Sequence, residues 1–359
     1  MNVVTIMYSG LSGTASVVFS LIKADHTGNK HSIIFIGIEN AAEEYITNCK
    51  NSGIDFYIIV KKPGLDLSAQ KKVICYLKNS APDVVIMHNL NTILPVAYYA
   101  AGKKVSVIAV EHQANSLKNQ KDWARSMLTM QLADNVVFLT ELYRSQMKDK
   151  LGILFRTGKT AVINNGLEPG IFSRGIPEER SVIKIGMLAR MVDIKDHLTL
   201  ISAMRLLSEE YGWEKKIKLL LAGSGPMMET LIQSTKTNDL QDQIEFCGFI
   251  TEKQSASFLK DLDIYVHASY GETMSTAIMQ AMASGKAIIA SDVTGINNMI
   301  THGETGLLVP VKDGDSLAAA IDKLLRNKPL QDKLSLNAYE YAISTFSSAN
   351  MFRKYAELF

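Results

Sequence analysis

Cysteine is scarce in this sequence: Cys49, Cys75 and Cys247 lie far apart and show neither CxxC nor Cys/His spacing. We therefore expect reduced, structural thiols rather than a disulfide framework or a zinc site, and no other spacing suggests a metal. No apolar run reaches the roughly 18 residues that a membrane-spanning helix needs. The first residues lack the basic segment of a signal peptide and enter a strand pattern directly. These absences favour a folded cytoplasmic protein without a resident metal.

What the sequence does contain is enough chain for two domains of ordinary size, with 359 residues of which 47% are apolar and 21% charged. The net charge of +2 is unevenly divided. Residues 1–175 carry 19 Lys and Arg against 13 Asp and Glu, a net +6, whereas residues 176–359 carry 19 against 23, a net −4. A basic first half suits an anionic partner such as a lipid pyrophosphate or a membrane surface, although an uneven surface without a function explains it equally well.

Short β-rich runs alternate with helical patterns along the chain. The runs are mostly continuous in apolar residues, as expected for parallel strands that are covered on both faces. The pattern restarts after a Gly- and Pro-rich linker at 166–180, so we predict an α/β protein of two doubly wound, Rossmann-like domains, 1–170 and 181–340, facing each other across a ligand-binding cleft. The predicted strands are 3–8, 32–38, 56–60, 84–88, 105–111, 135–140, 160–163, 183–187, 218–222, 244–247, 264–267, 287–291 and 306–309.

The segment 267–310 is the most informative, and it indicates a strand, a loop, a helix, a buried strand, then a short helix and a hairpin. Glu272 lies in the loop before the predicted helix 276–284, and Gln280 lies eight residues further on, about two helical turns away and on the same face. Amides at the helix N-terminus would face phosphate or hydroxyl oxygen atoms, so this arrangement can bind a sugar nucleotide. The alternative is an ordinary buried loop–helix–strand unit. The backbone amides at the N-terminus of the predicted helix are those of Met274, Ser275 and Thr276.

This segment resembles the donor-site signature of the retaining glycosyltransferases of family 4, in which Ser and Glu precede a second Glu and Ala-Met-Ala-x-Gly-x-Pro-Val-Ile-Ala. Two departures matter. Gln280 replaces the second Glu, which keeps an acceptor for ribose hydroxyls but loses the charge, and Thr-Met-Ser replaces the usual Gly-Phe-Gly after Glu272. The matching residues are Ser269, Glu272, Ala281, Met282, Ala283, Gly285, Ile288, Ile289 and Ala290. The resemblance implies the GT-B fold, in which a C-terminal helix, here within 341–359, crosses back onto the first domain.

Arg190 and Lys195 lie in a loop at the carboxyl end of the predicted strand 183–187. Two cations in such a loop can hold a diphosphate and stabilise its charge as it leaves. The loop resembles the family's Gly-x-x-x-Arg…Lys segment. The alternative is a solvated, charged loop.

Two glycine turns are weaker candidates for contact with the donor. The first follows strand 3–8 but lacks a full GxGxxG, and it looks like the family's Gly-Gly loop with Ser12 in place of the first Gly, which leaves Gly13 as the phosphate candidate. The second resembles the family's Gly-x-Gly-Pro and places Gly223 on the nucleotide side. Phe249 matches a position whose backbone usually meets the base. A plain turn is the alternative for each.

His112 ends the predicted strand 105–111 and resembles the histidine that family members place near the 6-hydroxyl of the donor sugar. A neutral imidazole could accept or donate one hydrogen bond there, and the alternative is a satisfied buried histidine. His88 ends the preceding strand and lines the same cleft in this interpretation.

Two further patterns indicate structure more than function. Asp261-Leu262-Asp263 looks like the metal-binding DxD of a different glycosyltransferase fold, but it joins a helix to a buried strand. Residues 118–130 hold Trp123 and several cations. That stretch could touch a membrane surface, although packing within the first domain is the preferred interpretation.

The resemblance implies a hexosyl- or N-acetylhexosaminyltransferase with a UDP-linked donor, retention of configuration and no cofactor or metal. Arg190 and Lys195 would hold the diphosphate, Glu272 would orient the sugar and Gln280 would meet the ribose. With the basic first half, it favours an acceptor that is a bacterial surface polysaccharide such as O-antigen, on a lipid carrier, at the inner face of the membrane. No nucleic-acid partner is expected. A nucleotide-sugar epimerase of the same architecture and a non-catalytic sugar-nucleotide-binding protein remain as alternatives.

Overall fold

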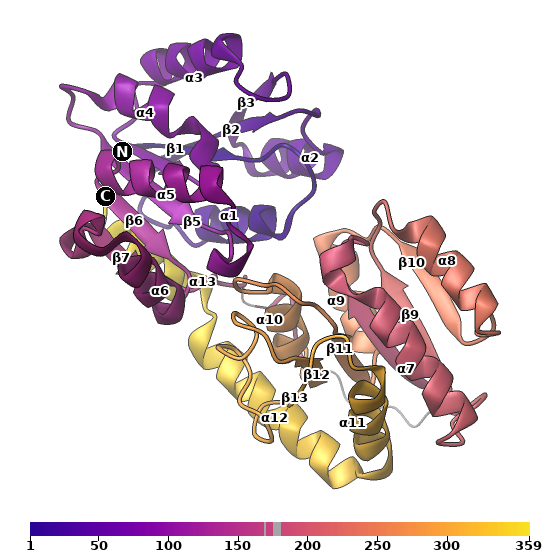
Figure 1. Ribbon diagram of the computed structural model, residues 1–359. Coiled ribbons are helices and arrows are strands. Elements are labelled where there is room, and N and C mark those ends of the chain that lie inside the picture. The colour runs from indigo at the N-terminus through magenta and orange to yellow at the C-terminus, as the bar shows by residue number, and fades with distance from the viewer. Residues whose placement is uncertain (169, 175–180) are drawn as a thin grey trace. The chain divides into compact units, whose positions relative to one another are not determined.

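The computed structural model describes residues 1–168, 170–174 and 181–359. Residues 169 and 175–180, which belong to the predicted linker, lie outside this description. The chain divides into two compact units (Figure 1), one formed by Met1–Glu168 with Ser348–Phe359 and the other by Pro169–Ser347. We call them the first and the second domain. Each is a doubly wound parallel sheet covered by helices, which confirms the predicted fold class.

The sheet of the first domain has seven parallel strands in the order β3-β2-β1-β4-β5-β6-β7. The strands are β1 Asn2–Met7, β2 Lys30–Gly37, β3 Asp55–Val60, β4 Val84–Met87, β5 Ser106–Glu111, β6 Asn135–Phe138 and β7 Thr160–Val162. The helices are α1 Gly13–Lys23, α2 Glu43–Ser52, α3 Leu67–Ser80, α4 Ile93–Ala100, α5 Gln120–Leu132, α6 Glu141–Leu151 and α13 Ser348–Ala356. Short 3₁₀ turns are η1 Leu90–Thr92, η2 Asn115–Leu117, η3 Gly152–Leu154 and η4 Thr157–Lys159.

Both faces of this sheet are buried, because successive side chains of a strand point to opposite faces. On β2, Ile33 and Phe35 pack with α1 and α2, whereas Ile34 and Ile36 pack with α3 to α6. A strand buried on both faces reads as one apolar run, which is why the sequence revealed these strands. The helix α13 returns from the far end of the sequence and packs beside α1 (Figure 1).

The sheet of the second domain has six parallel strands in the order β10-β9-β8-β11-β12-β13. The strands are β8 Ile183–Leu188, β9 Ile217–Ala222, β10 Ile244–Gly248, β11 Ile264–His267, β12 Ala287–Ser291 and β13 Leu307–Val309. The helices are α7 His197–Glu209, α8 Met228–Thr237, α9 Glu252–Asp261, α10 Thr276–Ala283, α11 Gly314–Arg326 and α12 Lys328–Thr345, and a 3₁₀ turn, η5, spans Asp193–Lys195.

The strand order reverses direction once in each sheet, between β1 and β4 in the first domain and between β8 and β11 in the second. In open α/β sheets, ligands bind beyond the carboxyl ends of the strands at this switch point. The loops after β8 and β11 carry Lys195 and Glu272. Two of the residues predicted from the sequence, Lys195 and Glu272, therefore lie at the edge of the sheet where a ligand is expected to bind.

One local prediction is wrong. The short helix and hairpin expected between β12 and residue 310 are replaced by turns and by β13, which pairs with β12 in parallel. In the described part of the chain, none of the helices combines the length and the apolar character that crossing a membrane requires.

Candidate active site

The loops that follow β8 and β11 are tied together at the switch point of the second domain. Ser269 Oγ donates a hydrogen bond to the Ile194 carbonyl (2.9 Å), and the Tyr270 amide donates to the same oxygen (3.1 Å). The Tyr270 hydroxyl also bonds to the carboxylate of Asp193. These contacts fix the loop that carries the predicted cations against the loop that carries the predicted acid.

Glu272 lies at the centre of these contacts. Its Oε1 forms an ion pair with Lys195 Nζ and lies 2.7 Å from Nε2 of His267. The side chains of Glu272 and Lys195 are 11% and 18% exposed, so they remain reachable from solvent, whereas His267 is buried. An oxygen held by an ammonium and an imidazole together has a fixed position, as a site that orients a substrate requires.

The charge on Glu272 is strongly stabilised. Burial acts to raise the pKa of this carboxyl, but the Lys195 ammonium and the hydrogen bond from His267 outweigh burial and hold the pKa at about 2. Glu272 is therefore an anion at neutral pH, able to accept hydrogen bonds from hydroxyl groups and unable to act as a general acid.

A buried chain of polar groups continues behind Glu272. Nδ1 of His267 lies 3.0 Å from the hydroxyl of Tyr265, two residues earlier on the same face of β11, and that hydroxyl is 3.3 Å from the Leu188 carbonyl. Ser275 Oγ lies 3.4 Å from Nε2 of the same ring. Burial lowers the pKa of His267, although Glu272 opposes this, so the ring is neutral at pH 7.

His197, the first residue of α7, is a second buried imidazole in this region. Its Nε2 is buried and has no hydrogen-bond partner among the described residues. Burial lowers the pKa of His197 to about 4, with smaller contributions from His267 and Lys195. This ring is therefore also neutral at pH 7.

Arg190 lies in the turn after β8, is exposed, and forms no ion pair with any described residue. The turn around it is packed against glycines. A Cβ at Gly223 (φ +141°) would clash with the Ala189 carbonyl, and one at Gly225 (φ +157°) would clash with the Met191 carbonyl. Gly223 is thus required by the close approach of two loops, and its function is to shape the segment that carries Arg190.

The N-terminus of α10 opens at the same edge of the sheet. Ser275 is the N-cap, and its Oγ accepts a hydrogen bond from the Ile278 amide (3.4 Å). Thr276 begins the helix, and Met274 and Gln280 are both 6% exposed. Phe249, directly after the end of β10, is 46% exposed.

The first domain contributes a separate set of residues. Gly13 is exposed at the start of α1, next to Ser12, whose amide bonds to the Tyr45 hydroxyl (2.7 Å). Nδ1 of His88, after β4, lies 2.7 Å from Nε2 of His112, after β5. Gly13 and His88 thus follow the two strands that flank the switch point of this sheet, and His112 follows the neighbouring strand.

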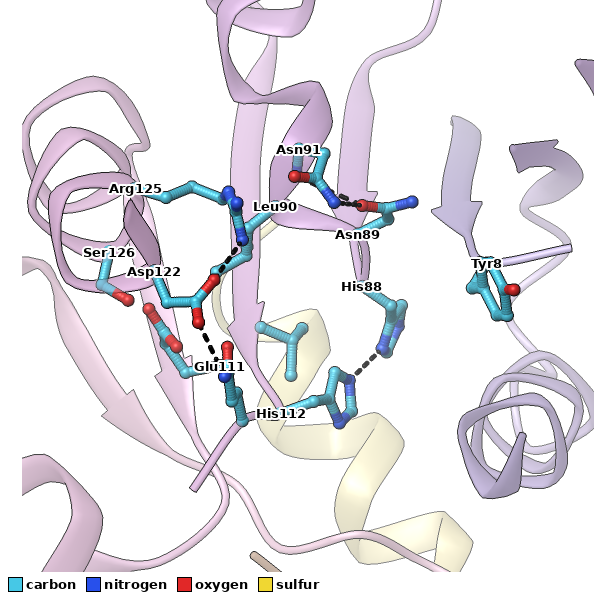
Figure 2. Close-up of a pocket in the computed structure, with 12 residues that line it drawn as sticks. Tyr8, His88, Asn89, Leu90, Asn91, Glu111, His112, Asp122, Arg125 and Ser126 are labelled. Atoms are coloured by element: carbon cyan, nitrogen blue, oxygen red, sulfur yellow. Dashed lines mark hydrogen bonds and ion pairs between the residues drawn. The ribbon is translucent and has the colours of Figure 1, made fainter. Parts of the chain in front are cut away.

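The two imidazoles line a cavity of about 250 Å³ in the first domain. Figure 2 shows them between Tyr8 on one side and the Asp122–Arg125 pair of α5 on the other. Burial lowers the pKa of His112 to about 4, and it also holds the pKa of His88 well below its usual value, with a contribution from His112. The cavity therefore presents neutral rings beside an internally balanced ion pair.

Two patterns of the sequence prove structural. Lys118 forms a 2.8 Å ion pair with Glu111, and its side chain is 1% exposed, so this ion pair anchors the start of the stretch 118–130 in the first domain. Asp261 and Asp263 both bind Lys184, through its ammonium (2.7 Å) and its amide (2.8 Å) respectively. Among the described residues, no group of three potential ligands could hold a metal.

Comparison with known proteins decides the family. A model described as "Glycosyltransferase Family 4" matches residues 11–170, and one described as "Glycosyl transferases group 1" matches residues 171–341. The chain belongs to the family 4 glycosyltransferases. The family resemblance of the segment around Glu272 is therefore confirmed.

Relatives of this glycosyltransferase are diverse. The chain is 25% identical to an uncharacterized glycosyltransferase of Methanocaldococcus jannaschii over 72% of its own length and 68% of the relative's. It is 31% identical to a lipopolysaccharide core biosynthesis glycosyltransferase of Rhizobium meliloti over 49% of each. It is 26% identical to a 2-deoxystreptamine N-acetyl-D-glucosaminyltransferase of Niallia circulans over 48% of its length and 43% of the relative's. The match thus spans about half the length of the last two proteins.

Solved structures agree on the fold. Anabaena HepE in complex with UDP and glucose superposes with a TM-score of 0.84 at 16% identity, covering 99% of this chain and 98% of the other. The pneumococcal O-GlcNAc transferase GtfA in complex with UDP and GlcNAc gives 0.80 at 13% identity, with the same coverage. The family 4 glycosyltransferase therefore has the GT-B fold.

The sequence did not reveal the roles of Tyr265 and His267. Both belong to a short strand that reads as plain core, and their polar partners come from loops elsewhere in the chain. The available signal was a pair of polar residues two positions apart in an otherwise apolar strand, the second of them five residues before the predicted acid.

Proposed function

We propose that this protein is a retaining glycosyltransferase that transfers a hexosyl or N-acetylhexosaminyl group from a UDP-linked donor to a glycan or lipid-linked saccharide. The observation that carries the proposal is the contact between Lys195 and Glu272 at the switch point of the second domain. The pair places a cation suited to a diphosphate beside an anion suited to sugar hydroxyls. HepE bound to UDP-glucose and GtfA bound to UDP support the choice of nucleotide.

The leaving diphosphate would be held by Arg190 and Lys195. Arg190 is exposed and unpaired among the described residues, so its fork of donors is available, and Lys195 adds a point charge. Two cations at this position stabilise the negative charge that develops on the phosphate as the sugar departs. Because the side chains supply this charge, we propose that turnover needs no metal.

The sugar would be oriented by Glu272 and by the amides of Met274, Ser275 and Thr276 at the start of α10. Backbone amides at a helix N-terminus point toward the site and suit oxygen atoms of hydroxyl or phosphate groups. Gln280, further along α10, would meet the ribose and Phe249 the base, and Gly223 keeps the Arg190 turn in place. His112 and Gly13 would meet the donor from the first domain.

Retention is proposed through attack on the same face that the leaving group vacates. Glu272 is engaged by both Lys195 and His267, which makes it a poor nucleophile. The acceptor hydroxyl would attack through an ion-pair-like transition state, which needs no nucleophilic side chain, and the departing phosphate would take the proton of that hydroxyl.

A donor panel with a matched arginine control tests this proposal. Thermal stabilisation is measured with UDP, GDP and ADP and their sugar conjugates; a ligand at about 100 times its Kd adds roughly 2.7 kcal/mol. Arg190→Ala should lower turnover roughly 100-fold while the unfolding midpoint is unchanged. Arg205→Ala, on the exposed face of α7, should leave both unchanged.

The same panel separates the alternatives. Nuclear magnetic resonance of the product gives the anomeric configuration, and an inverted product would refute retention. Donor turnover without acceptor would indicate an epimerase, and binding without nucleotide release would indicate a non-catalytic protein. Loss of turnover on chelation would refute metal independence.

The acceptor is proposed to be a growing bacterial surface polysaccharide, such as O-antigen, on a lipid carrier at the inner face of the membrane. The relative from lipopolysaccharide core biosynthesis supports this class. The loop between β3 and α3, together with the first residue of α3, offers a surface for membrane contact, because Leu65 and Leu67 are 78% and 73% exposed beside Lys61 and Lys62. Apolar side chains flanked by cations suit an anionic bilayer.

Vesicle binding tests this contact. A Leu65→Ser, Leu67→Ser double variant should sediment less with vesicles that contain anionic lipid, and high salt should release the wild type. Ile153→Ser removes an even more exposed apolar side chain elsewhere in the first domain and should bind as the wild type does. Equal binding by both variants would refute this surface.

A further inference from the structure

One continuous chain of contacts runs from the end of β8 to the ammonium of Lys195. It passes from the Leu188 carbonyl to Tyr265, from Tyr265 to His267, and from His267 to Glu272, which pairs with Lys195. Tyr265 and His267 are 0% and 1% exposed, so water does not replace any of their partners.

The positions of the protons in this chain follow from the chemistry of the groups. The Glu272 carboxylate only accepts hydrogen bonds, so Nε2 of His267 carries a proton. When the ring is neutral, Nδ1 has a lone pair and the Tyr265 hydroxyl donates to it. When the ring is an imidazolium, Nδ1–H donates to the Tyr265 oxygen, and the hydroxyl proton turns to the Leu188 carbonyl, 3.3 Å away. Tyr265 therefore satisfies His267 in both protonation states without moving a heavy atom.

We propose that His267 is the positioning residue of Glu272, and that it takes up a proton from solvent when the donor diphosphate binds beside Lys195. The inference rests on the proposed function for the identity of the ligand. It adds to that function a change in the protonation of His267 when the ligand binds. His267 does not touch the donor in this scheme. It keeps Glu272 in place while Lys195 turns toward the phosphate.

The electrostatic reason lies in the groups that face His267. These are Glu272 from the loop after β11, Lys195 from the loop after β8, His197 at the start of α7, and Tyr265 on its own strand. In the free protein the Lys195 ammonium disfavours a second positive charge nearby. A bound diphosphate neutralises that ammonium and adds negative charge, so a proton on His267 becomes favourable.

The hydrogen bond from His267 to Glu272 is tested without any ligand. Nitrogen-15 resonances of the histidine rings at pH 7 should show His267 neutral, with its proton on Nε2. A neutral ring with its proton on Nδ1 would overturn the positioning role, and a ring already charged at pH 7 would overturn the protonation step. This measurement does not depend on what the protein binds.

Proton uptake is tested by calorimetry of UDP-glucose binding at pH 7 in two buffers of different ionisation heat. A sugar-linked diphosphate has no terminal phosphate that titrates near this pH, so any uptake belongs to the protein. Uptake is expected in the wild type and in His197→Gln. It should vanish in His267→Gln, whose amide still donates to Glu272 but cannot hold an added proton.

The outcomes separate the two proposals. Binding of UDP-glucose with no uptake in the wild type, or with equal uptake in His267→Gln, would overturn the protonation step. Failure of every UDP conjugate to bind would refute the proposed donor, and with it the protonation step, whereas the positioning role would stand or fall on the ring resonances alone.

Activity supplies a readout that a purely structural role would not move. His267→Phe leaves Glu272 without its imidazole donor and should lower kcat about tenfold or more, with a smaller change in KM. His267→Gln should recover most of that loss. Equal damage by both variants in folded protein would count against positioning, and His267→Gln alone carries the test if the phenylalanine variant does not fold.

Discussion

His88 and His112 share a single proton: Nδ1 of the first lies 2.7 Å from Nε2 of the second, in rings whose centroids are 5.0 Å apart. Two nitrogen atoms at this distance form a hydrogen bond only if one carries the proton and the other does not. The pair is satisfied with both rings neutral, whereas protonation of both rings would break this hydrogen bond and place two like charges in contact.

We expect this pair to make the first domain sensitive to acid. The pKa of His112 is about 4 in the folded state and about 6.5 in the unfolded chain, so its contribution to stability is complete above pH 6.5 and is lost as the pH falls to 4. His112→Asn should flatten this decline by up to about 1.4 kcal/mol per pH unit. Trp123 fluorescence in a Trp213→Phe background reports the first domain, because each domain holds one tryptophan.

The control is His26→Gln, which alters an exposed histidine of the same domain. It should leave the pH dependence of the unfolding free energy as in the wild type. An unchanged slope in His112→Asn would show that His112 is not held neutral.

The second domain should respond to acid through Glu272. Its folded pKa of about 2 lies below the unfolded value of 4.5, so the stabilisation is present above pH 4.5 and is lost as the pH falls toward 2. Glu272→Gln should therefore cost on the order of 3 kcal/mol at pH 7 and almost nothing near pH 2. Trp213 fluorescence in a Trp123→Phe background follows the transition. Glu304→Gln, at an exposed glutamate, should show no such pH dependence.

Gly223 should tolerate no side chain. Gly223→Ala forces a Cβ into the Ala189 carbonyl and displaces the turn that carries Arg190, so we expect a loss of at least about 2 kcal/mol together with weaker donor binding. Gly212 also has a positive φ, +74°, but open space around its Cβ position. Gly212→Ala should cost only about 1 kcal/mol of backbone strain and leave donor binding intact. Equal effects of the two substitutions in denaturant unfolding would contradict the packing argument.

The buried pair of Glu111 and Lys118 should depend on both partners. Lys118→Met leaves a carboxylate that is 5% exposed without its cation and should cost about 3–5 kcal/mol. A Glu111→Gln, Lys118→Met double variant should recover much of this loss, because no buried charge remains. The exposed pair of Lys30 and Asp55 is the control, and Lys30→Met should cost less than about 1 kcal/mol. A double variant that is no more stable than Lys118→Met would show that the two residues are not coupled.

Sequence reasoning was reliable where one physical rule governed a whole segment. All thirteen strands of the described residues fall where continuous apolar runs predicted them, because a parallel strand covered on both faces has no polar side to interrupt the run. The connection after β12 was predicted wrongly, because a short helix and a hairpin were expected there, whereas the chain forms turns and places β13 parallel to β12.

The site was predictable only in part, for a different reason. Glu272 and Lys195 stood out because charged residues at the ends of apolar strands are conspicuous. Their contact, and the chain through His267 to Tyr265, joins positions that are 77 residues apart in sequence. Such partners become visible only when the loops are placed in space.

The helix α13 has a consequence for how the protein is made. Its residues 348–356 follow the entire second domain in sequence, yet they complete the first, where the Ser348 amide bonds to the Leu167 carbonyl (3.1 Å) and Ser106 Oγ to the Leu358 carbonyl (2.9 Å). A ribosome delivers the chain from its N-terminus, and domains usually fold in that order. Here the half that emerges first must wait, with the flank of α1 uncovered, until the other half has been translated. During that interval the nascent first domain is the part of the molecule that a chaperone would be expected to hold.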